Sequence, residues 1–146
     1  MTDLVPCSDV EARLAELADA EMAFLGRDCL IEPIPTIVDR FAETRLFAVP
    51  GCRGLVGITP NPLNGYEGEI DVALPGGEGY AEVIAAALRL AATHLALRTV
   101  VRYEPNRDDR AEHFERAGLR LLGVLHGARF QDGGYHDQRV WQGVTG

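Results

Sequence analysis

The chain has 146 residues, the usual length of one domain, and its 47% hydrophobic and 25% charged residues are those of an average globular protein. This composition excludes a disordered, collagen-like or low-complexity protein. The net charge is −8, and acids outnumber arginines ten to four in residues 1–45, which disfavours nucleic acid as a partner and suits a cationic one.

Two helices are predicted in the first third of the chain. Behind an N-cap at Ser8 or Asp9, apolar residues recur at mostly three- and four-residue spacings, which predicts an amphipathic helix over residues 8–25. Only a short strand fits before it. Pro33 and Pro35 then interrupt the chain, and a second short helix is predicted over residues 36–44.

The middle of the chain changes to strand patterns. Short apolar runs at 46–49 and 55–59, joined by a turn-rich link, predict a hairpin, and a loop is expected at 60–65. Charged and apolar residues alternate in a strand predicted over 69–74. A glycine-rich turn then leads into an apolar-striped helix predicted over 80–97.

The last third is predicted to add a strand at 98–103 and a helix through 111–117, capped by Asp108 or Asp109 and followed by Gly118. Strands at 121–130 and 135–141 are joined by a turn with an Asp-Gly pair, a strong hairpin signal. The expected fold class is therefore a mixed α/β (α+β) domain spanning residues 1–146, with no internal repeat or linker.

Missing residue types restrict the chemistry. All 14 basic residues are arginine, so a lysine Schiff base or a phosphate-binding loop lysine is excluded. Ser8 is the single serine and lacks the context of a serine hydrolase. The three cysteines and four histidines lack metal-ligand spacing, so no metal is expected. No apolar run approaches the ~18 residues of a membrane span, which predicts a cytoplasmic protein without a membrane partner.

The strand, glycine loop and helix of residues 69–97 are the most informative unit. Glycines let a ligand approach the backbone closely, and the free N–H groups of a helix N-terminus attract anions. The loop is therefore a candidate diphosphate site, although a tight strand-to-helix turn alone also needs glycine.

The order of elements resembles the GNAT superfamily of acyl-CoA N-acyltransferases over nearly the whole chain. The stretch EIDVALPGGEGYAEVIAAAL resembles the acetyl-CoA-binding strand, loop and helix of that family. The stretch PNRDDRAEHFERAGLRLLGVLHGARFQDGGYHDQRVW is similar to its last strands and helix, in the branch that acetylates protein N-terminal amines and small antibiotic amines. The resemblance implies a central, mostly antiparallel sheet flanked by helices.

The resemblance also implies which residues hold acetyl-CoA. Backbone groups of the strand end are expected to pair with the pantetheine arm, loop N–H groups to bind the diphosphate, and Asn106 to face the donor. The expected donor-binding residues are Val72, Ala73, Leu74, Gly76, Gly77, Glu78, Gly79, Tyr80, Ala81 and Asn106. Leu74 and Gly76 replace residues that are commonly Arg or Gln in the family, and Glu78 adds a negative charge, so backbone donors must dominate and binding is expected to be weak.

Amine acylation requires a base for the acceptor and an acid for the leaving thiolate. Glu69 is the preferred base, with Glu67 and Asp71 as competing acids. Because alternate strand residues share a face, Asp71 is also a candidate for binding a cationic substrate beside Glu69.

The family's usual tyrosine acid is replaced by Phe114, which cannot donate a proton. Water, Tyr80, Tyr103 or Tyr135 must then supply it, and Tyr135 is taken with Glu69 as a candidate catalytic residue.

The resulting hypothesis is an acetyltransferase that transfers acetyl from acetyl-CoA to a primary amine, by direct attack in a ternary complex. The acceptor is a small cationic molecule or a peptide N-terminus, and the resemblance suggests a homodimer. Two alternatives stay open: a catalytically degenerate ligand-binding or regulatory module of this fold, and an acyltransferase that uses a different thioester donor.

Overall fold

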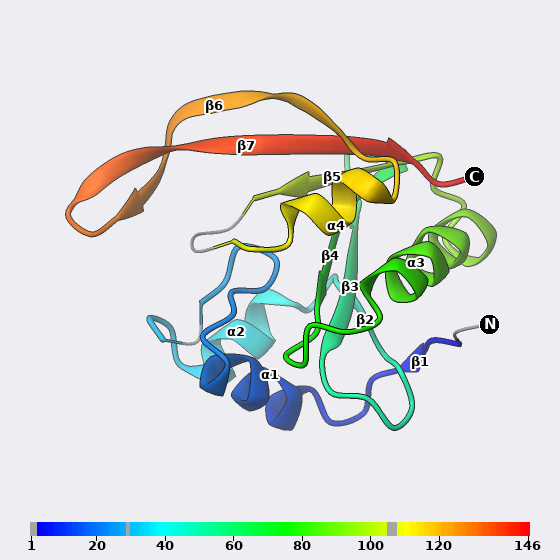
Figure 1. Ribbon diagram of the computed structural model, residues 1–146, viewed down its shortest axis with the longest axis horizontal. Helices are drawn as coiled ribbons and strands as arrows, with labels where there is room; N and C mark the ends of the chain where they lie inside the picture. Colours follow the sequence, from blue (N-terminus) through cyan, green and yellow to red (C-terminus); the bar gives the residue numbers. More distant parts are fainter. Residues whose placement is uncertain (1–2, 29, 105–107) are drawn as a thin grey trace.

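In residues 3–28, 30–104 and 108–146, which the computed structural model describes, four helices flank one seven-stranded sheet (Figure 1). In chain order the elements are β1 (Val5–Pro6), α1 (Val10–Asp19), α2 (Ile34–Arg40), β2 (Arg45–Ala48), β3 (Leu55–Asn61), β4 (Asn64–Ala73), α3 (Tyr80–His94), β5 (Thr99–Tyr103), α4 (Ala111–Arg116), β6 (Arg120–Gln131) and β7 (Gly134–Val144).

The strands are arranged in the order β1-β2-β3-β4-β5-β7-β6. All neighbouring strands are antiparallel except β4 and β5, which run parallel. This order confirms the expected mixed, mostly antiparallel sheet. It also places the only parallel pair among the described strands at the centre of the sheet, next to the glycine loop that follows β4.

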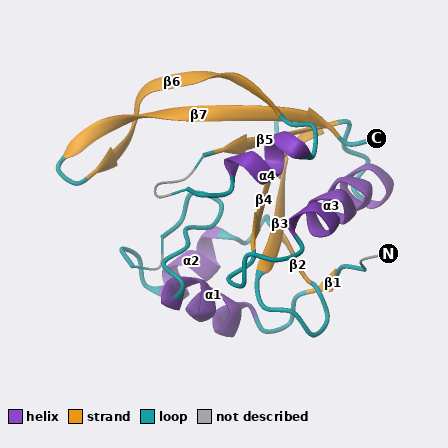
Figure 2. Ribbon diagram, viewed as in Figure 1, coloured by secondary structure: helices purple, strands orange, loops and turns teal. Residues whose placement is uncertain are grey.

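The alternation of side chains along the strands produces two cores. Ile70 and Val72 of β4 pack with α3, α4 and the last strand on one face of the sheet, whereas Ala73 packs with α1 and α2 on the other. Figure 2 shows α1 and α2 together, apart from α3 and α4. As a consequence, the odd-numbered residues at the end of β4, including Glu69 and Asp71, belong to the side covered by α1 and α2.

The prediction of a first helix over residues 8–25 is wrong for residues 20–25. α1 ends at Asp19, and Glu21 and Leu25 have positive φ values of 57° and 48°. The apolar spacing continues past the helix because Met22 and Leu25 pack against the core that contains Phe24, so burial rather than helical periodicity explains it.

Two other helix starts also differ from the expectation. α2 begins at Ile34, with Pro33 as its N-cap and Pro35 in its first turn, because proline suits a helix start that does not need its N–H group. Asp108 and Asp109 do not cap α4, whose N-cap is Arg110 without a side-chain hydrogen bond. Asp108 pairs with arginines instead, as described below.

The hairpins follow the sequence signals closely. β2 and β3 pair as predicted, and Asp132 and Gly133 both have positive φ at the turn between β6 and β7, as a two-residue Asp-Gly turn requires. The loop expected at 60–65 is shorter, because Pro60 and Asn61 belong to β3 and Asn64 and Gly65 to β4.

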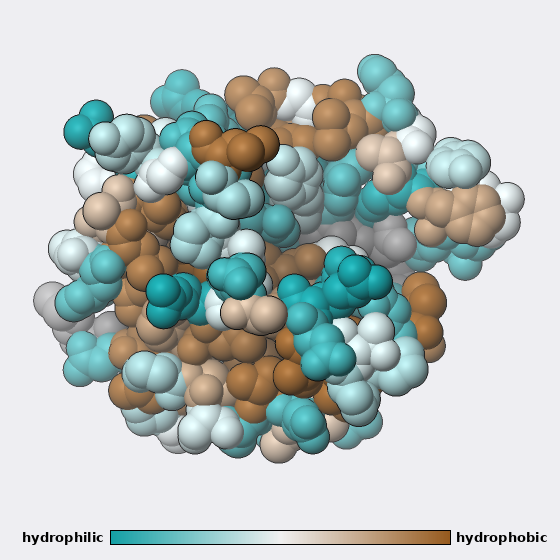
Figure 3. All heavy atoms as spheres, turned by 180° about the vertical axis from the view of Figure 1, so that it is seen from behind, coloured by the Kyte–Doolittle hydropathy of each residue, from teal (hydrophilic) through white to brown (hydrophobic). Residues whose placement is uncertain are grey.

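The β6–β7 hairpin extends beyond the rest of the molecule (Figure 1). β6 is an edge strand and is exposed over most of its length. Seen from behind in Figure 3, apolar surface gathers along the top of the molecule, where these strands run. The exposed apolar residues of β6 are Leu121, Leu122, Val124, Leu125 and Phe130.

Candidate functional site

β4 and β5 separate in the middle of the sheet. Their parallel pairing covers only Glu67 to Glu69 of β4, opposite Thr99 to Val101 of β5. Beyond Glu69 the two strands no longer pair, so the last residues of β4 have an edge that faces a split in the sheet. This split leads directly to the glycine loop and the N-terminus of α3.

Glu69 lies at the start of this split. It is half-buried, and burial together with the negative charge of Asp71 raises the pKa of Glu69 to about 7, although Arg27 partly opposes this. A carboxyl group with a pKa near 7 is divided between its acid and base forms at neutral pH, which is the condition for efficient proton transfer. Glu69 can therefore accept a proton at physiological pH.

Two aspartates and two arginines bridge the split; we call Asp71, Arg102, Asp108 and Arg110 the charge quartet. Arg102, from β5, contacts Asp108 with two hydrogen bonds of 3.1 and 2.7 Å and donates to Asp71 from Nε at 3.2 Å. All four side chains are at most 3% exposed. Burial alone would raise the pKa of Asp108, but its hydrogen bond with Arg102 and the charges of both arginines hold that pKa below its usual value.

Arg110 joins three parts of the chain. Its Nη1 donates to Asp71 at 3.3 Å and to the backbone oxygen of Val72 at 3.0 Å, and its Nη2 donates to the backbone oxygen of Ala23 at 2.6 Å. Nε also donates to Asp108 at 3.3 Å. The guanidinium of Arg110 therefore ties the start of α4 to β4 and to the loop between α1 and α2.

That loop covers the odd-numbered face of β4. The N–H of Leu25 donates to Asp71 Oδ2 at 2.9 Å. Gly57, the β3 partner of Asp71, lies under this loop, because a Cβ atom there would come within 2.6 Å of Leu25 Cδ1 and 2.8 Å of Phe24 Cζ. Arg27, from the same loop, is close enough to act on Glu69 and pairs with Glu32 at 3.4 Å.

The predicted anion loop has the backbone that its glycines allow. Gly77 and Gly79 have positive φ values of 74° and 85°, and Gly79 is the N-cap of α3 without a side-chain cap. The first N–H groups of α3 are therefore available to an anion. Glu78 and the first-turn residue Glu82 place two carboxylates beside them.

Cavities lie on both sides of this loop. One of about 680 Å³ separates it from the β2–β3 turn and includes Arg53, which pairs with Glu16 at 3.3 Å. Another of about 160 Å³ lies between the loop, the end of α1 and the start of α4, and it is lined by Arg110 and His113. A groove of about 330 Å³ between α3 and α4 includes Ala81, His113 and Arg116.

The residues expected to bind acetyl-CoA fit it only in part. The loop residues 76–79 are exposed and can approach a diphosphate. The edge of β4 is closed, because Val72 N–H donates to Asp71 Oδ1 at 2.9 Å, Val72 O accepts from Arg110, and Leu74 N–H donates to Tyr80 Oη at 2.9 Å. Ala73 is buried against the α1–α2 side. A pantetheine arm does not fit along β4 in this conformation.

The candidate proton donors lie in different surroundings. Tyr135 is 75% exposed near the end of the β6–β7 hairpin and contacts Phe130. Phe114 is fully buried, with the Arg102 guanidinium 4.2 Å from its ring centre. Tyr80 is buried beside the split and stacks on His113 at 4.3 Å, and its burial raises the pKa of its hydroxyl. Asn106 lies outside the described residues.

The two arginines of the charge quartet are not among the site residues predicted from the sequence. A signal for Arg102 is present, because it lies two residues from the core residue Val100 on a short strand and must then share its face. A buried arginine requires an acidic partner, and the run Asp108–Asp109 follows closely. The contact of Arg110 with Val72 has no such signal, since it depends on how α4 and β4 meet.

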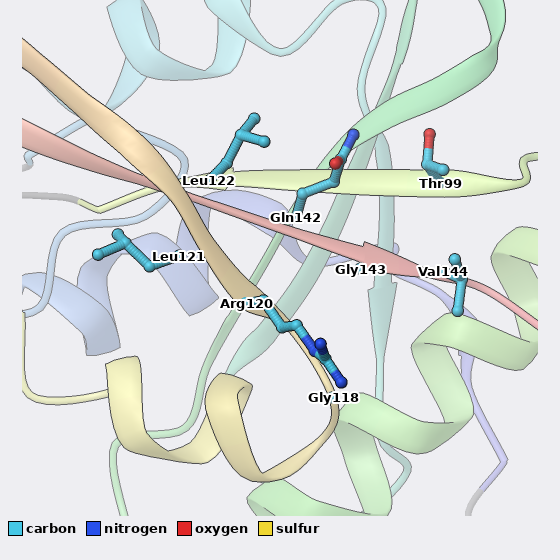
Figure 4. Close-up of a pocket in the computed structure, with 8 residues that line it drawn as sticks. All are labelled: Thr99, Gly118, Arg120, Leu121, Leu122, Gln142, Gly143 and Val144. Atoms are coloured by element: carbon cyan, nitrogen blue, oxygen red, sulfur yellow. The ribbon is translucent and has the colours of Figure 1, made fainter.

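A cavity of about 400 Å³ lies on the other side of the split, between β5, β6 and β7. Figure 4 shows Thr99, Leu122 and Gln142 on one side of these strands. Thr99 and Gln142 each donate to Glu67 Oε2 at 3.4 Å. Among the described residues that line it, Arg120 is the single ionisable one.

Within the described parts of the chain, no three His, Cys, Asp or Glu side chains are grouped so that they could hold a metal ion. Among the same residues, no helix combines the length and apolar character that a membrane span needs.

Comparisons with known proteins identify the fold. No protein-family model matches the chain, and no curated protein matches its sequence. Solved structures do match. A protein classed provisionally as a phosphinothricin N-acetyltransferase has a TM-score of 0.76 and 16% identity, covering 100% of this chain and 99% of its own. A chimera of the spermidine N-acetyltransferase SpeG from Vibrio cholerae and hSSAT has a TM-score of 0.73 and 17% identity, and the match covers 98% of this chain and 95% of the chimera. Mutant forms of the spermidine/spermine N-acetyltransferase SpeG of Vibrio cholerae have a TM-score of 0.70 and 17% identity, and the match covers 99% of this chain and 95% of theirs. The chain therefore has the GNAT fold.

Proposed function

We propose that the protein is an N-acetyltransferase that uses acetyl-CoA to acylate a primary amine, with Glu69 as the base. The observation that carries the proposal is the position of Glu69. It lies where β4 and β5 stop pairing, on the same strand that ends at the uncapped glycine loop. One strand thus links a proton acceptor to an anion-binding loop, as an amine acylation with a diphosphate-bearing donor requires.

In this proposal the donor supplies the acyl group, and the chain supplies position and a proton acceptor. The loop N–H groups and the helix dipole of α3 hold the diphosphate. Glu69 removes a proton from the acceptor ammonium, so that its nitrogen has a free electron pair for attack on the thioester. The C–S bond of the thioester breaks as the amide bond forms, and the leaving thiolate takes a proton from water. Asp71 acts through Glu69, since its charge contributes to the raised pKa of Glu69.

We propose a cationic amine as the acceptor class. Glu67 and Glu69 occupy the same face of β4, and the acids of residues 1–45 give that half of the chain a negative field. Solved structures with this fold include proteins named as spermidine N-acetyltransferases, which agrees with this acceptor class.

The test is release of free thiol from acetyl-CoA in the presence of a panel of amines that includes spermidine, a peptide with a free N-terminus and a neutral amine. Wild type is expected to turn over cationic amines, and Glu69→Gln to lose about 10²- to 10⁴-fold in kcat. Glu43→Gln, an exposed position outside the site, is the matched control. Acetylation of neutral amines alone would disprove the acceptor class, and equal rates for wild type and Glu69→Gln would disprove the role of Glu69.

A second function is favoured by the closed edge of β4. If the contacts of Arg110 and Tyr80 persist when a ligand binds, the protein is a non-catalytic binding module that recognises the diphosphate alone. Calorimetry separates the two functions. Binding of acetyl-CoA that Gly76→Trp abolishes, without turnover of any amine, supports the module. Gly76 suits this test because a Cβ atom there meets nothing within 4 Å.

A further inference from the structure

The edge of β4 that faces the split is occupied by side chains of the chain itself. Val72 offers one N–H and one carbonyl oxygen toward the split, and both are used, by Asp71 and by Arg110. The next N–H along the edge, that of Leu74, donates to the Tyr80 hydroxyl. An extended ligand that pairs with β4 as an added strand needs these same groups.

We propose that Arg110 is a plug that closes the edge of β4 and competes with the arm of an acyl-CoA donor, so that its removal opens the split. This inference rests on the proposed function for the identity of the ligand. Arg110 controls the edge because it is the one member of the charge quartet that binds a backbone oxygen of β4.

The geometry makes the plug a bridge between β4 and the α1–α2 loop. Nη1 holds β4 through Val72 O and Asp71, and Nη2 holds the α1–α2 loop through Ala23 O. Asp71 in turn accepts the N–H of Leu25 from the same loop. Arg110 also lines the cavity beside the glycine loop. Movement of its side chain into that cavity would free Val72 O and loosen the α1–α2 loop at the same time.

The plug also explains why Arg102 and Arg110 have different roles, although they share both aspartates. Arg102 makes a two-bond contact with Asp108 and lies over the Phe114 ring, and no described hydrogen bond joins it to the backbone of β4. Loss of Arg102 removes a buried charge and leaves the edge closed. Loss of Arg110 removes a buried charge and also frees Val72 O on the edge. The two substitutions are therefore a matched pair.

The test compares wild type with Arg110→Met and Arg102→Met. Methionine has a similar length, packs without charge, and limits the packing loss. Arg110→Gln is a second variant in case Arg110→Met does not fold, and thermal unfolding checks each protein. The first readout is amide hydrogen exchange at Val72 and Leu74. Arg110 holds both Val72 O and Asp71, which accepts the Val72 N–H, so its loss should let this end of β4 open more often. We therefore expect exchange to rise at least about tenfold in Arg110→Met and to rise less in Arg102→Met, which keeps the contact of Arg110 with Val72 O.

The second readout is calorimetric binding of two probes. CoA carries the arm, whereas 3′-phospho-ADP carries the nucleotide and diphosphate without it. Arg110→Met should bind CoA at least about tenfold more tightly than wild type and bind 3′-phospho-ADP equally well, because closure penalises only the arm. Arg102→Met should not show this difference between probes.

The outcomes separate the plug from the proposed function. Unchanged exchange at Val72 and Leu74 in Arg110→Met, or an unchanged or weaker affinity for CoA, overturns the plug. If neither probe binds wild type or any variant, the acyl-CoA donor is disproved. The exchange comparison then still decides whether Arg110 closes the edge of β4.

Discussion

Asp71 Oδ1 lies 3.2 Å from Arg102 Nε, and this contact joins β4 to β5 beyond the point where their backbones stop pairing. Charged side chains thus replace backbone hydrogen bonds in the middle of the sheet. Two aspartates balance two arginines, so the charge quartet is neutral as a group. A buried group of this kind is costly to disturb one member at a time, because each loss leaves a partner charge uncompensated.

We predict that Asp71→Asn strongly destabilises the protein. The amide removes a negative charge that faces Arg102 and Arg110 while almost preserving the shape of the side chain. Loss of one member of a buried ion pair typically costs about 3–5 kcal/mol. Urea unfolding measures the change, and Glu112→Gln, from the exposed pair with Arg116, should stay within about 0.5 kcal/mol of wild type. A loss for Asp71→Asn as small as that of this control would contradict the prediction.

A second prediction concerns Glu69 and the pH dependence of stability. Burial and the charge of Asp71 raise the pKa of Glu69 from 4.5 to about 7 in the folded state. Between these pH values the unfolded chain releases a proton that the folded protein keeps, so wild type loses stability as pH rises, and the loss ends above about pH 7.

Glu69→Gln lacks this loss. Its stability relative to wild type should increase from pH 4.5 to about 7 and then stay level, by an amount on the order of 3 kcal/mol at most. Urea unfolding of both proteins at several pH values measures the difference. A difference that is the same at every pH would show that Glu69 ionises in the folded protein as it does in the unfolded chain.

The sequence predicted the fold well because its signals are local. The Asp132–Gly133 turn, the apolar stripe of α3 and the alternation in β4 each depend on neighbours a few residues apart. The end of α1 could not be predicted, because the apolar residues after Asp19 continue a helical spacing while they fill a core against β3. Only tertiary packing distinguishes these two causes of apolar spacing.

The site was predicted less completely for a similar reason. The positions of Glu69 and the glycine loop follow from the strand and turn patterns. The closure of β4 by Arg110 depends on a contact 38 residues away in the chain, which no local pattern encodes. Asp108 shows the limit clearly, since an aspartate just before a helix usually indicates a cap, and here it pairs with two buried arginines.

Gly57→Ala should destabilise the protein by about 1–3 kcal/mol. The new methyl group would lie 2.6 Å from Leu25 Cδ1 and 2.8 Å from Phe24 Cζ, so the α1–α2 loop must move away from β3. This movement also weakens the hydrogen bond from Leu25 to Asp71. Thermal unfolding measures the effect, with Gly65→Ala as the control, because a Cβ atom at Gly65 meets nothing within 4 Å. Equal stability of the two variants would mean that the loop yields freely.

Glu78→Gln should strengthen the binding of CoA by a few-fold at low salt. The carboxylate of Glu78 is exposed on the loop whose N–H groups are proposed to hold the diphosphate, and a like charge at such a position costs on the order of 1 kcal/mol. Calorimetry at two salt concentrations checks the cause, since salt should reduce the gain. Glu43→Gln, which changes the net charge equally at an exposed position outside the loop, is the control. An equal gain from both variants would assign the effect to net charge and not to the loop.

The pH profile of turnover is the last prediction. If Glu69 takes the proton from the bound acceptor, kcat should rise tenfold per pH unit below about pH 7 and level off above it, because the pKa of Glu69 is about 7 and only its ionised form is a base. Measurements with saturating acceptor restrict the profile to groups of the bound state. Asp71→Asn removes the charge that helps to raise this pKa, so the break should move to lower pH in the folded fraction of that variant. A break near pH 7 that persists in Glu69→Gln would assign the titration to another group.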